Sequence, residues 1–332
     1  MSRFQHPFAA ARSFGRQALL LAALVTPLTA QEPSRPAADS LALAARYDSV
    51  GAALIQGERY RSAIDSLRVA VSLDPARPTA ARRLGVAYIE LGEFGLALRE
   101  LGRAHEFDSA SAPTKYWTAF AHALRGDEAE ARRWAGRLPP TTYGKTHAAL
   151  LLLYIDAARG GLPAMTGHAE ALAASMPDSV YRRLFAGDAA LYAGRLEEAA
   201  AQYRAALAIA PDARNGPSGH FAATSLALVL RRMRREAEAD ALLEQSMRLN
   251  HARVAEGRDS QGYPYDVASA YAVQGNRREA LKWLAKAVDA GWRKRAFTEH
   301  DPLLATLRGE REFQRQLRRM TGLTGTAVAQ DR

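Results

Sequence analysis

Apolar residues recur at helical spacing in paired stretches along most of this chain. The clearest pair spans residues 179 to 211, where two amphipathic patterns are joined by a Gly-Arg turn and the second pattern ends at Pro211. Ala199, Tyr203 and Ala206 lie on one face of the second pattern. Neither predicted helix could bury its apolar face alone, so the pair needs neighbouring pairs against which to pack.

The pattern repeats toward the N-terminus at intervals of 34 residues. The positions equivalent to Ala199 are Met165, Ala131, Ala97 and Ala63, and those equivalent to Gly194 are Gly160, Gly126 and Gly92. After Pro211 the phase slips, because the next matching alanine is Ala239, forty residues beyond Ala199. We therefore expect a longer loop near 211–219, a second one near 251–263, and two further helix pairs.

Two sets of positions define the repeated unit. On the first helix of a unit, the recurring residues are Tyr47, Val50, Gly51 and Leu54 in the first unit, and Leu84, Gly85 and Tyr88 in the second. On the second helix they are Ala63, Leu67, Ala70 and Pro75 in the first unit, and Ala199, Tyr203, Ala206 and Pro211 in the fifth. This arrangement resembles the motif of the tetratricopeptide repeat family. The resemblance implies an all-α fold, a right-handed α-solenoid of about seven tetratricopeptide helical hairpins with a C-terminal capping helix. The small residues would lie where two helix backbones approach closely.

The repeat spacing also divides the chain into segments. The repeat array covers residues 41–292 and is degenerate around 141–177. Residues 293–320 place apolar side chains at helical spacing among many charges, so we expect them to form a cap that covers the last hairpin. Residues 321–332 are expected to be a disordered tail.

The N-terminal sequence is typical of a secretory signal peptide, residues 1–30. Arg3, Arg12 and Arg16 form a basic start without acidic residues, and an apolar run follows before a cleavage site of small residues. This apolar run is about 11 residues long, whereas a membrane span needs roughly 20. Residues 31–40 are expected to be a flexible leader. The pattern predicts export to the periplasm or the medium, with an uncleaved membrane anchor or an amphipathic arm as the alternative; the absence of cysteine rules out a lipid anchor.

Positive charge is concentrated near the C-terminus. The chain has a formal net charge of +10, and residues 277–319 hold twelve Lys or Arg and six Asp or Glu, a net +6. This segment suggests an alternative function, a basic module that docks on an anionic envelope polymer or lipid. Ordinary solvated charge is the other interpretation. We expect no nucleic-acid partner, because an exported protein seldom meets nucleic acid.

No pattern in the sequence predicts catalysis, a cofactor or a metal. The segment from Tyr143 to Thr146 ends like a phosphate loop but lacks that motif's first glycine and its preceding strand. Asp301, followed by Pro302, is expected to cap a helix rather than to act in catalysis. His122 is expected to be a hydrogen-bonded core histidine. We therefore expect a protein that is not an enzyme.

The family resemblance implies a binding surface. The first helix of each hairpin in such arrays lines a concave groove, and the residues expected to point into it share aromatic, aliphatic or charged character. They are Arg82, Ile89, Tyr116, Phe120, Tyr154, Asp188, Leu191 and Tyr192. Aromatic side chains on such a surface favour a protein or peptide ligand. The alternative is that Tyr116, Phe120 and Tyr154 are buried between repeats. The sequence thus predicts a non-enzymatic, exported scaffold that binds a protein or peptide partner in this groove.

Overall fold

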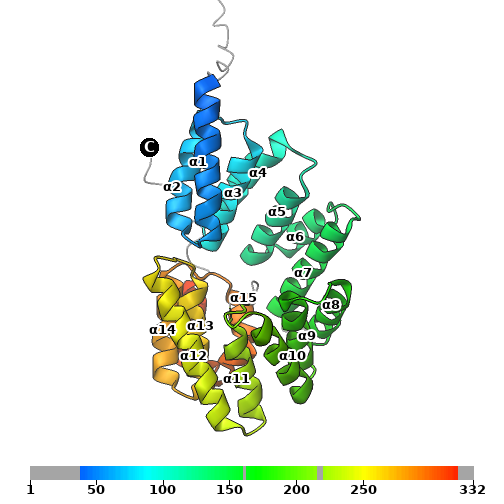
Figure 1. The fold of residues 1–332 in the computed structure, drawn as a ribbon, viewed down its shortest axis with the longest axis vertical. Helices are drawn as coiled ribbons and strands as arrows, with labels where there is room; N and C mark the ends of the chain where they lie inside the picture. Colours follow the sequence, from blue (N-terminus) through cyan, green and yellow to red (C-terminus); the bar gives the residue numbers. More distant parts are fainter. Residues whose placement is uncertain (1–37, 160–161, 215–219, 321–332) are drawn as a thin grey trace, which may run out of the picture. The chain divides into compact units, whose positions relative to one another are not determined.

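The structure is a computed structural model, and it describes residues 38–159, 162–214 and 220–320. Within these ranges fourteen helices form seven consecutive hairpins (Figure 1). The hairpins are α1 (Ala38–Gln56) with α2 (Tyr60–Leu73), α3 (Pro78–Glu90) with α4 (Phe94–Phe107), α5 (Ala112–Arg125) with α6 (Glu128–Ala135), α7 (Thr142–Arg159) with α8 (Leu162–Ser175), α9 (Val180–Tyr192) with α10 (Leu196–Ile209), α11 (Ala222–Arg232) with α12 (Glu236–Ala255), and α13 (Gly262–Gln274) with α14 (Arg277–Asp289).

The two helices of each hairpin pack on each other, and the second helix of each of the first six hairpins packs on the first helix of the next. The first helices of successive hairpins also contact one another, α1 with α3, α3 with α5, α5 with α7, and α11 with α13. We call the surface along which these helices meet the first-helix face. The predicted all-α array of about seven hairpins is confirmed.

Close packing within hairpins explains the repeated glycines. A Cβ atom placed on Gly85 would lie 2.7 Å from Cγ of Leu101, and one on Gly187 would lie 2.7 Å from Cε1 of Tyr203. Gly51 meets Leu67 in the same way in the first hairpin. In each case the glycine on the first helix leaves room for a large side chain of the second, which is the packing that the repeat pattern predicts.

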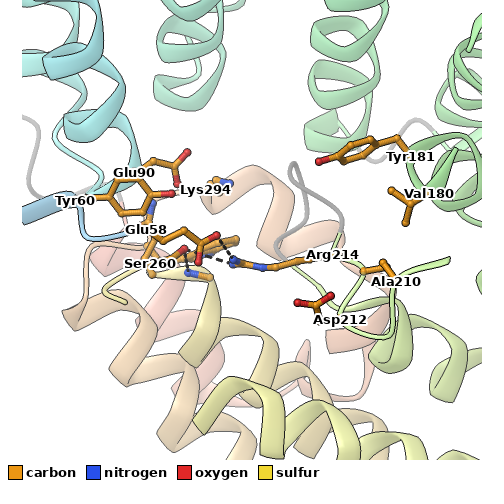
Figure 2. Close-up of a pocket in the computed structure, with 14 residues that line it drawn as sticks. Glu58, Tyr60, Glu90, Val180, Tyr181, Ala210, Asp212, Arg214, Ser260 and Lys294 are labelled. Atoms are coloured by element: carbon orange, nitrogen blue, oxygen red, sulfur yellow. Dashed lines mark hydrogen bonds and ion pairs between the residues drawn. The ribbon is translucent and has the colours of Figure 1, made fainter. Parts of the chain in front are cut away.

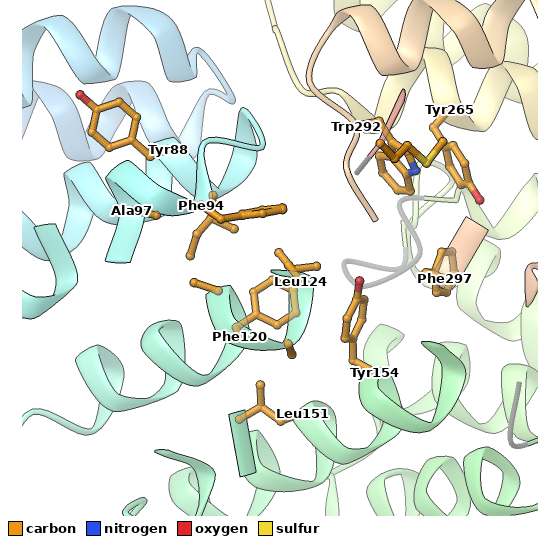
Figure 3. Close-up of a cluster of buried hydrophobic side chains, with 14 of the residues drawn as sticks. Tyr88, Phe94, Ala97, Phe120, Leu124, Leu151, Tyr154, Tyr265, Trp292 and Phe297 are labelled. Carbon is orange, nitrogen blue, oxygen red and sulfur yellow. The ribbon is translucent and has the colours of Figure 1, made fainter. Parts of the chain in front are cut away.

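The C-terminal cap consists of three short helices rather than one. They are α15 (Arg295–His300), the 3₁₀ helix η1 (Pro302–Leu307) and α16 (Arg311–Arg319). η1 and α16 pack on the last hairpin, as a cap should, but α15 packs on α7 of the fourth hairpin. Phe297 of α15 stacks on Tyr154 of α7 with their ring centroids 6.3 Å apart (Figure 3).

The first two hairpins also contact the last two. The carboxylate of Asp259, between α12 and α13, accepts hydrogen bonds from the backbone N–H groups of Tyr60 at 2.6 Å and Arg61 at 3.0 Å. The backbone N–H of Asp259 donates to the carbonyl of Glu58 at 2.9 Å. Gly92 and Gly291, both with positive φ, place the α3–α4 turn against the turn that follows α14. One cluster of buried apolar side chains runs from α2 to α8 and continues into α13, α14 and the cap, and Figure 3 shows part of it; a second cluster lies mainly in α9 to α12.

Some predicted boundaries differ from the described helices. The sequence predicts a leader over residues 31–40, but α1 begins at Ala38. It also predicts a loop over 251–263, but α12 continues to Ala255, where Asn250 anchors its last turns by donating to Asp266 at 2.8 Å. The predicted signal peptide, the tail 321–332 and residues 215–219 lie outside the described residues. No helix in the described ranges is long and apolar enough to span a membrane.

Candidate functional site

The structure separates the predicted groove residues into two groups. Ile89, Phe120, Tyr154, Asp188 and Leu191 are buried, whereas Arg82, Tyr116 and Tyr192 are partly exposed. Tyr154 is covered because α15 packs on α7, and Phe120 packs against it with ring centroids 5.4 Å apart. Asp188 accepts a hydrogen bond from the hydroxyl of Tyr203 at 2.6 Å, so it joins α9 to α10.

Four partly exposed side chains form what we call the inner aromatic patch: Arg82, Tyr116, Tyr143 and His147. They come from α3, α5 and α7, the first helices of three successive hairpins. The ring of His147 stacks on Tyr143 at 3.7 Å and meets the edge of Tyr116 at 4.6 Å between centroids. Burial raises the pKa of Tyr143, and the nearby Arg82 guanidinium partly offsets this rise. The patch therefore combines a half-buried cation with aromatic rings that still reach solvent.

Sequence reasoning predicted only half of this patch. The sequence around Tyr143 resembles only the end of a phosphate loop, whereas the structure places Tyr143 in α7, which begins at Thr142. His147 follows Tyr143 by one helical turn, and its Nδ1 lies 2.7 Å from the Tyr143 carbonyl oxygen. The spacing of these two residues at the start of a predicted helix is the signal that could have identified them.

A separate pocket of about 390 Å³ lies where the first two hairpins meet the last three (Figure 2). It is lined by charged, aromatic and small residues, including Glu58, Tyr60, Glu90, Asp212, Arg214, Gln261, Trp292 and Lys294. None of the predicted groove residues lines it. Arg214 approaches Glu58 at 3.4 Å, and the hydroxyl of Tyr263 donates to the same carboxylate. The contacts that join the two ends of the array therefore also form one wall of this pocket.

A buried ionic network lies beside the cap. His220, 2% exposed, places Nδ1 3.2 Å from Asp266 and Nε2 2.8 Å from Asp301. Burial opposes the imidazolium form, but Asp301 and Asp266 outweigh burial and raise the pKa of His220 to about 9. Tyr265 also donates to Asp301, at 2.6 Å. Burial alone would raise the pKa of Asp266, but its hydrogen bond from His220 contributes to a net lowering.

One member of this network also caps a helix of the C-terminal segment. Asp301 caps η1 through the backbone N–H of Leu303 at 2.9 Å, with Pro302 at the start of the helix, which confirms the predicted cap. His122 approaches Asp127 at 3.4 Å and is half-buried. Among the described residues, no cluster of three or more His, Asp or Glu side chains is arranged to hold a metal ion.

The basic segment 277–319 has much of its charge paired. At least six of its twelve cationic side chains lie within 4.0 Å of a carboxylate, among them Arg277, Arg278, Lys282, Arg295, Arg315 and Arg319. Lys294 is buried, at 7% exposure, and Lys286 lies 3.7 Å from the centroid of the Trp283 ring. Ion pairing and the burial of Lys294 therefore leave fewer exposed, unpaired cations than the twelve in the sequence, while the net charge of the segment stays at +6.

Comparison with known proteins yields helical-repeat structures. A tetratricopeptide repeat protein from Parabacteroides merdae is 16% identical with a TM-score of 0.45, over 80% of this chain and 98% of that one. Human IFIT1, solved as a dimer with m7Gppp-AAAA, is 13% identical with a TM-score of 0.47, over 74% of this chain and 72% of that one. Cut9, in the APC/C hetero-tetramer Cut9-Hcn1, is 13% identical with a TM-score of 0.48, over 85% and 54%. No family model and no curated protein sequence matches this chain.

The fold assignment rests on this chain's own residues. The repeat interval of 34 residues, the seven described hairpins and the contacts of Gly85 and Gly187 all agree. The described chain is an all-α array of helical hairpins, the fold that the resemblance to tetratricopeptide repeats predicts.

Proposed function

We propose that the protein is a non-enzymatic, exported scaffold that binds a protein or peptide partner on its first-helix face, at the inner aromatic patch. The observation that carries this proposal is that Tyr116 of α5 meets His147 of α7, while Arg82 of α3 lies near enough to Tyr143 of α7 to offset part of the rise that burial causes in the pKa of that tyrosine. A binding segment of a partner could contact three successive hairpins at once. The proposal of export rests on the N-terminal pattern of charge and hydrophobicity, which lies outside the described residues.

The chemistry of the patch suits a protein ligand. Tyr and Arg are among the residues that contribute most to binding at protein interfaces, because they combine a large contact area with hydrogen-bonding groups. Tyr143 is 37% exposed, and Arg82 is held half-buried beside it. Burial lowers the pKa of Arg82, so an acidic group on a partner would stabilise its charge. A peptide segment with acidic and aromatic side chains fits these properties.

The buried members of the predicted groove have a supporting role in this proposal. Phe120 stacks on Tyr116 with ring centroids 6.0 Å apart, and Tyr154 packs against Phe120 in an edge contact. They fix the orientation of Tyr116 rather than contact a partner. The alternative function, docking on anionic polymer or lipid through residues 277–319, is less favoured because at least six of the segment's twelve cations already pair with carboxylates.

The test is affinity capture from an envelope extract of the source cells, using the full chain and Arg82→Glu. The control is Arg103→Glu on α4, a cation that pairs with Glu100 at 3.4 Å outside the patch. We expect Arg82→Glu to reduce enrichment of the captured partner by about tenfold or more, with Arg103→Glu like the wild type. Equal capture by all three proteins would reject the patch as the binding surface.

A further inference from the structure

The pocket where the ends of the array meet is a second candidate site, independent of the inner aromatic patch. Its walls come from the α1–α2 turn, the end of α3, the start of α9, the segment after α10, the loop before α13 and the segment after α14 (Figure 2). Its volume of about 390 Å³ falls in the range of pockets that hold small molecules. The charges and apolar surfaces of its lining determine which ligands it can hold.

The lining carries charges of both signs. Glu58, Glu90 and Asp212 supply carboxylates, and Arg214 and Lys294 supply cations. Glu58 is held by Arg214 and by Arg258, at 3.4 and 3.8 Å, and Asp212 pairs with Arg253. A purely anionic ligand would meet Glu90, and a purely cationic one would meet Lys294. A ligand that carries both charges would find a counter-charge for each.

Glu90 and Lys294 are the pair that would provide these counter-charges. Burial lowers the pKa of Lys294 to about 8, and Glu90 is the strongest charge that opposes this change. Burial likewise raises the pKa of Glu90, with Lys294 as the strongest opposing charge. Lys294 is 7% exposed and Glu90 is partly exposed, so an added carboxylate near Lys294 and an added ammonium near Glu90 would each form a charge-assisted hydrogen bond in a poorly hydrated site.

Two further features of the lining fit such a ligand. The side-chain oxygen of Gln261 is buried without a hydrogen-bond partner, and an amide oxygen accepts from an N–H donor such as an ammonium. Trp292 and Tyr60 supply aromatic surface, and Nζ of Lys294 lies 4.8 Å from the Trp292 ring centroid. The pocket thus combines a polar end with an apolar wall.

We propose that this pocket binds a small zwitterion, a molecule with one ammonium and one carboxylate group, of which a free α-amino acid is the simplest example. Its ammonium pairs with Glu90 and its carboxylate with Lys294. Because Glu90 ends α3 and Lys294 precedes α15, the ligand bridges the second hairpin and the cap. Occupancy therefore stabilises the contact between the two ends of the array.

The test is calorimetric titration of the full chain with phenylalanine, phenylalanylphenylalanine, 2-phenylethylamine and 3-phenylpropanoate, after a thermal-shift screen of the twenty protein amino acids at about 10 mM. We expect at least one amino acid or the dipeptide to bind. The matched amine and the matched acid should bind about tenfold more weakly or worse. Tighter binding of phenylalanine would indicate a free amino acid as the ligand, and tighter binding of the dipeptide would indicate a peptide. Equal binding of the amine or the acid, or no binding in the whole screen, would overturn the proposal.

Variants locate the site. Lys294→Gln and Glu90→Gln should each weaken binding about tenfold, whereas Lys282→Gln, on the exposed side of α14, should bind as the wild type does. If either pocket variant fails to fold, acetylation of the unaltered protein gives the same information, since the chain has only five lysines. Bound ligand should then slow modification of Lys294 and leave Lys282 unchanged. Unchanged acetylation of Lys294 at saturating ligand would reject this pocket.

Discussion

Asp259 caps helix α2 from a position 199 residues away in the sequence, with its carboxylate 2.6 Å from the backbone nitrogen of Tyr60. The residue at the helix's own cap position, Arg59, makes no side-chain capping bond. The first helix pair therefore depends on the sixth and seventh hairpins for a contact that helices usually obtain locally. Mutation of Asp259 therefore tests how much the contact between the ends of the array stabilises the fold.

Replacing Asp259 should weaken that contact. We expect Asp259→Ala to lower the free energy of unfolding by about 1–2 kcal/mol, the usual cost of losing an N-cap, and Asp259→Asn to cost less because its amide oxygen can still accept one bond. Urea denaturation followed by circular dichroism measures the change. Glu244→Ala, an exposed residue on α12, is the control. A loss no larger than the control's would show that the cap contributes nothing to stability.

The buried network at His220 predicts a stability that depends on pH. The folded-state pKa is raised to about 9 from 6.5, so the stabilisation is complete below pH 6.5 and is lost as the pH rises through 9. Lys294 has the opposite sign, because its pKa is lowered from 10.5 to about 8, and it adds stability only as the pH rises above 8. Measurements between pH 6.5 and 8 therefore isolate the histidine.

Over that interval the wild type should lose about 1–2 kcal/mol of unfolding free energy that His220→Gln does not lose. The measurement is the urea midpoint of both proteins at several pH values. Parallel curves would contradict the account. A two-dimensional NMR titration of the His220 ring in the wild type gives the same answer if the variant does not fold.

Local periodicity predicted the features that depend on residues near in sequence. Gly187 meets Tyr203 within one hairpin, and Asp301 caps the turn that follows it, so spacing and residue type were sufficient. The same reasoning placed Arg82 and Tyr116 on the first-helix face. The glycine contacts recur because each hairpin packs its two helices in the same way.

Contacts between distant hairpins produce no repeated pattern in the sequence. The capping of α2 by Asp259 joins segments with no shared motif, and a single aspartate in a polar loop does not identify its partner. The burial of Tyr154 follows from the packing of α15 on α7, which spacing alone does not predict for a C-terminal cap. The pocket that holds Glu90 and Lys294 exists only because these ends meet.

The most direct test of the binding surface is photo-crosslinking from a single benzoylphenylalanine placed at position 143 on α7. The control is the same probe at position 107, where Phe107 is 53% exposed on α4, a second helix of its hairpin. In envelope extract, the probe at 143 should give a discrete crosslinked species that the probe at 107 does not, and Arg82→Glu should remove it. Labelling at 143 that is no stronger than at 107 would contradict the proposed function.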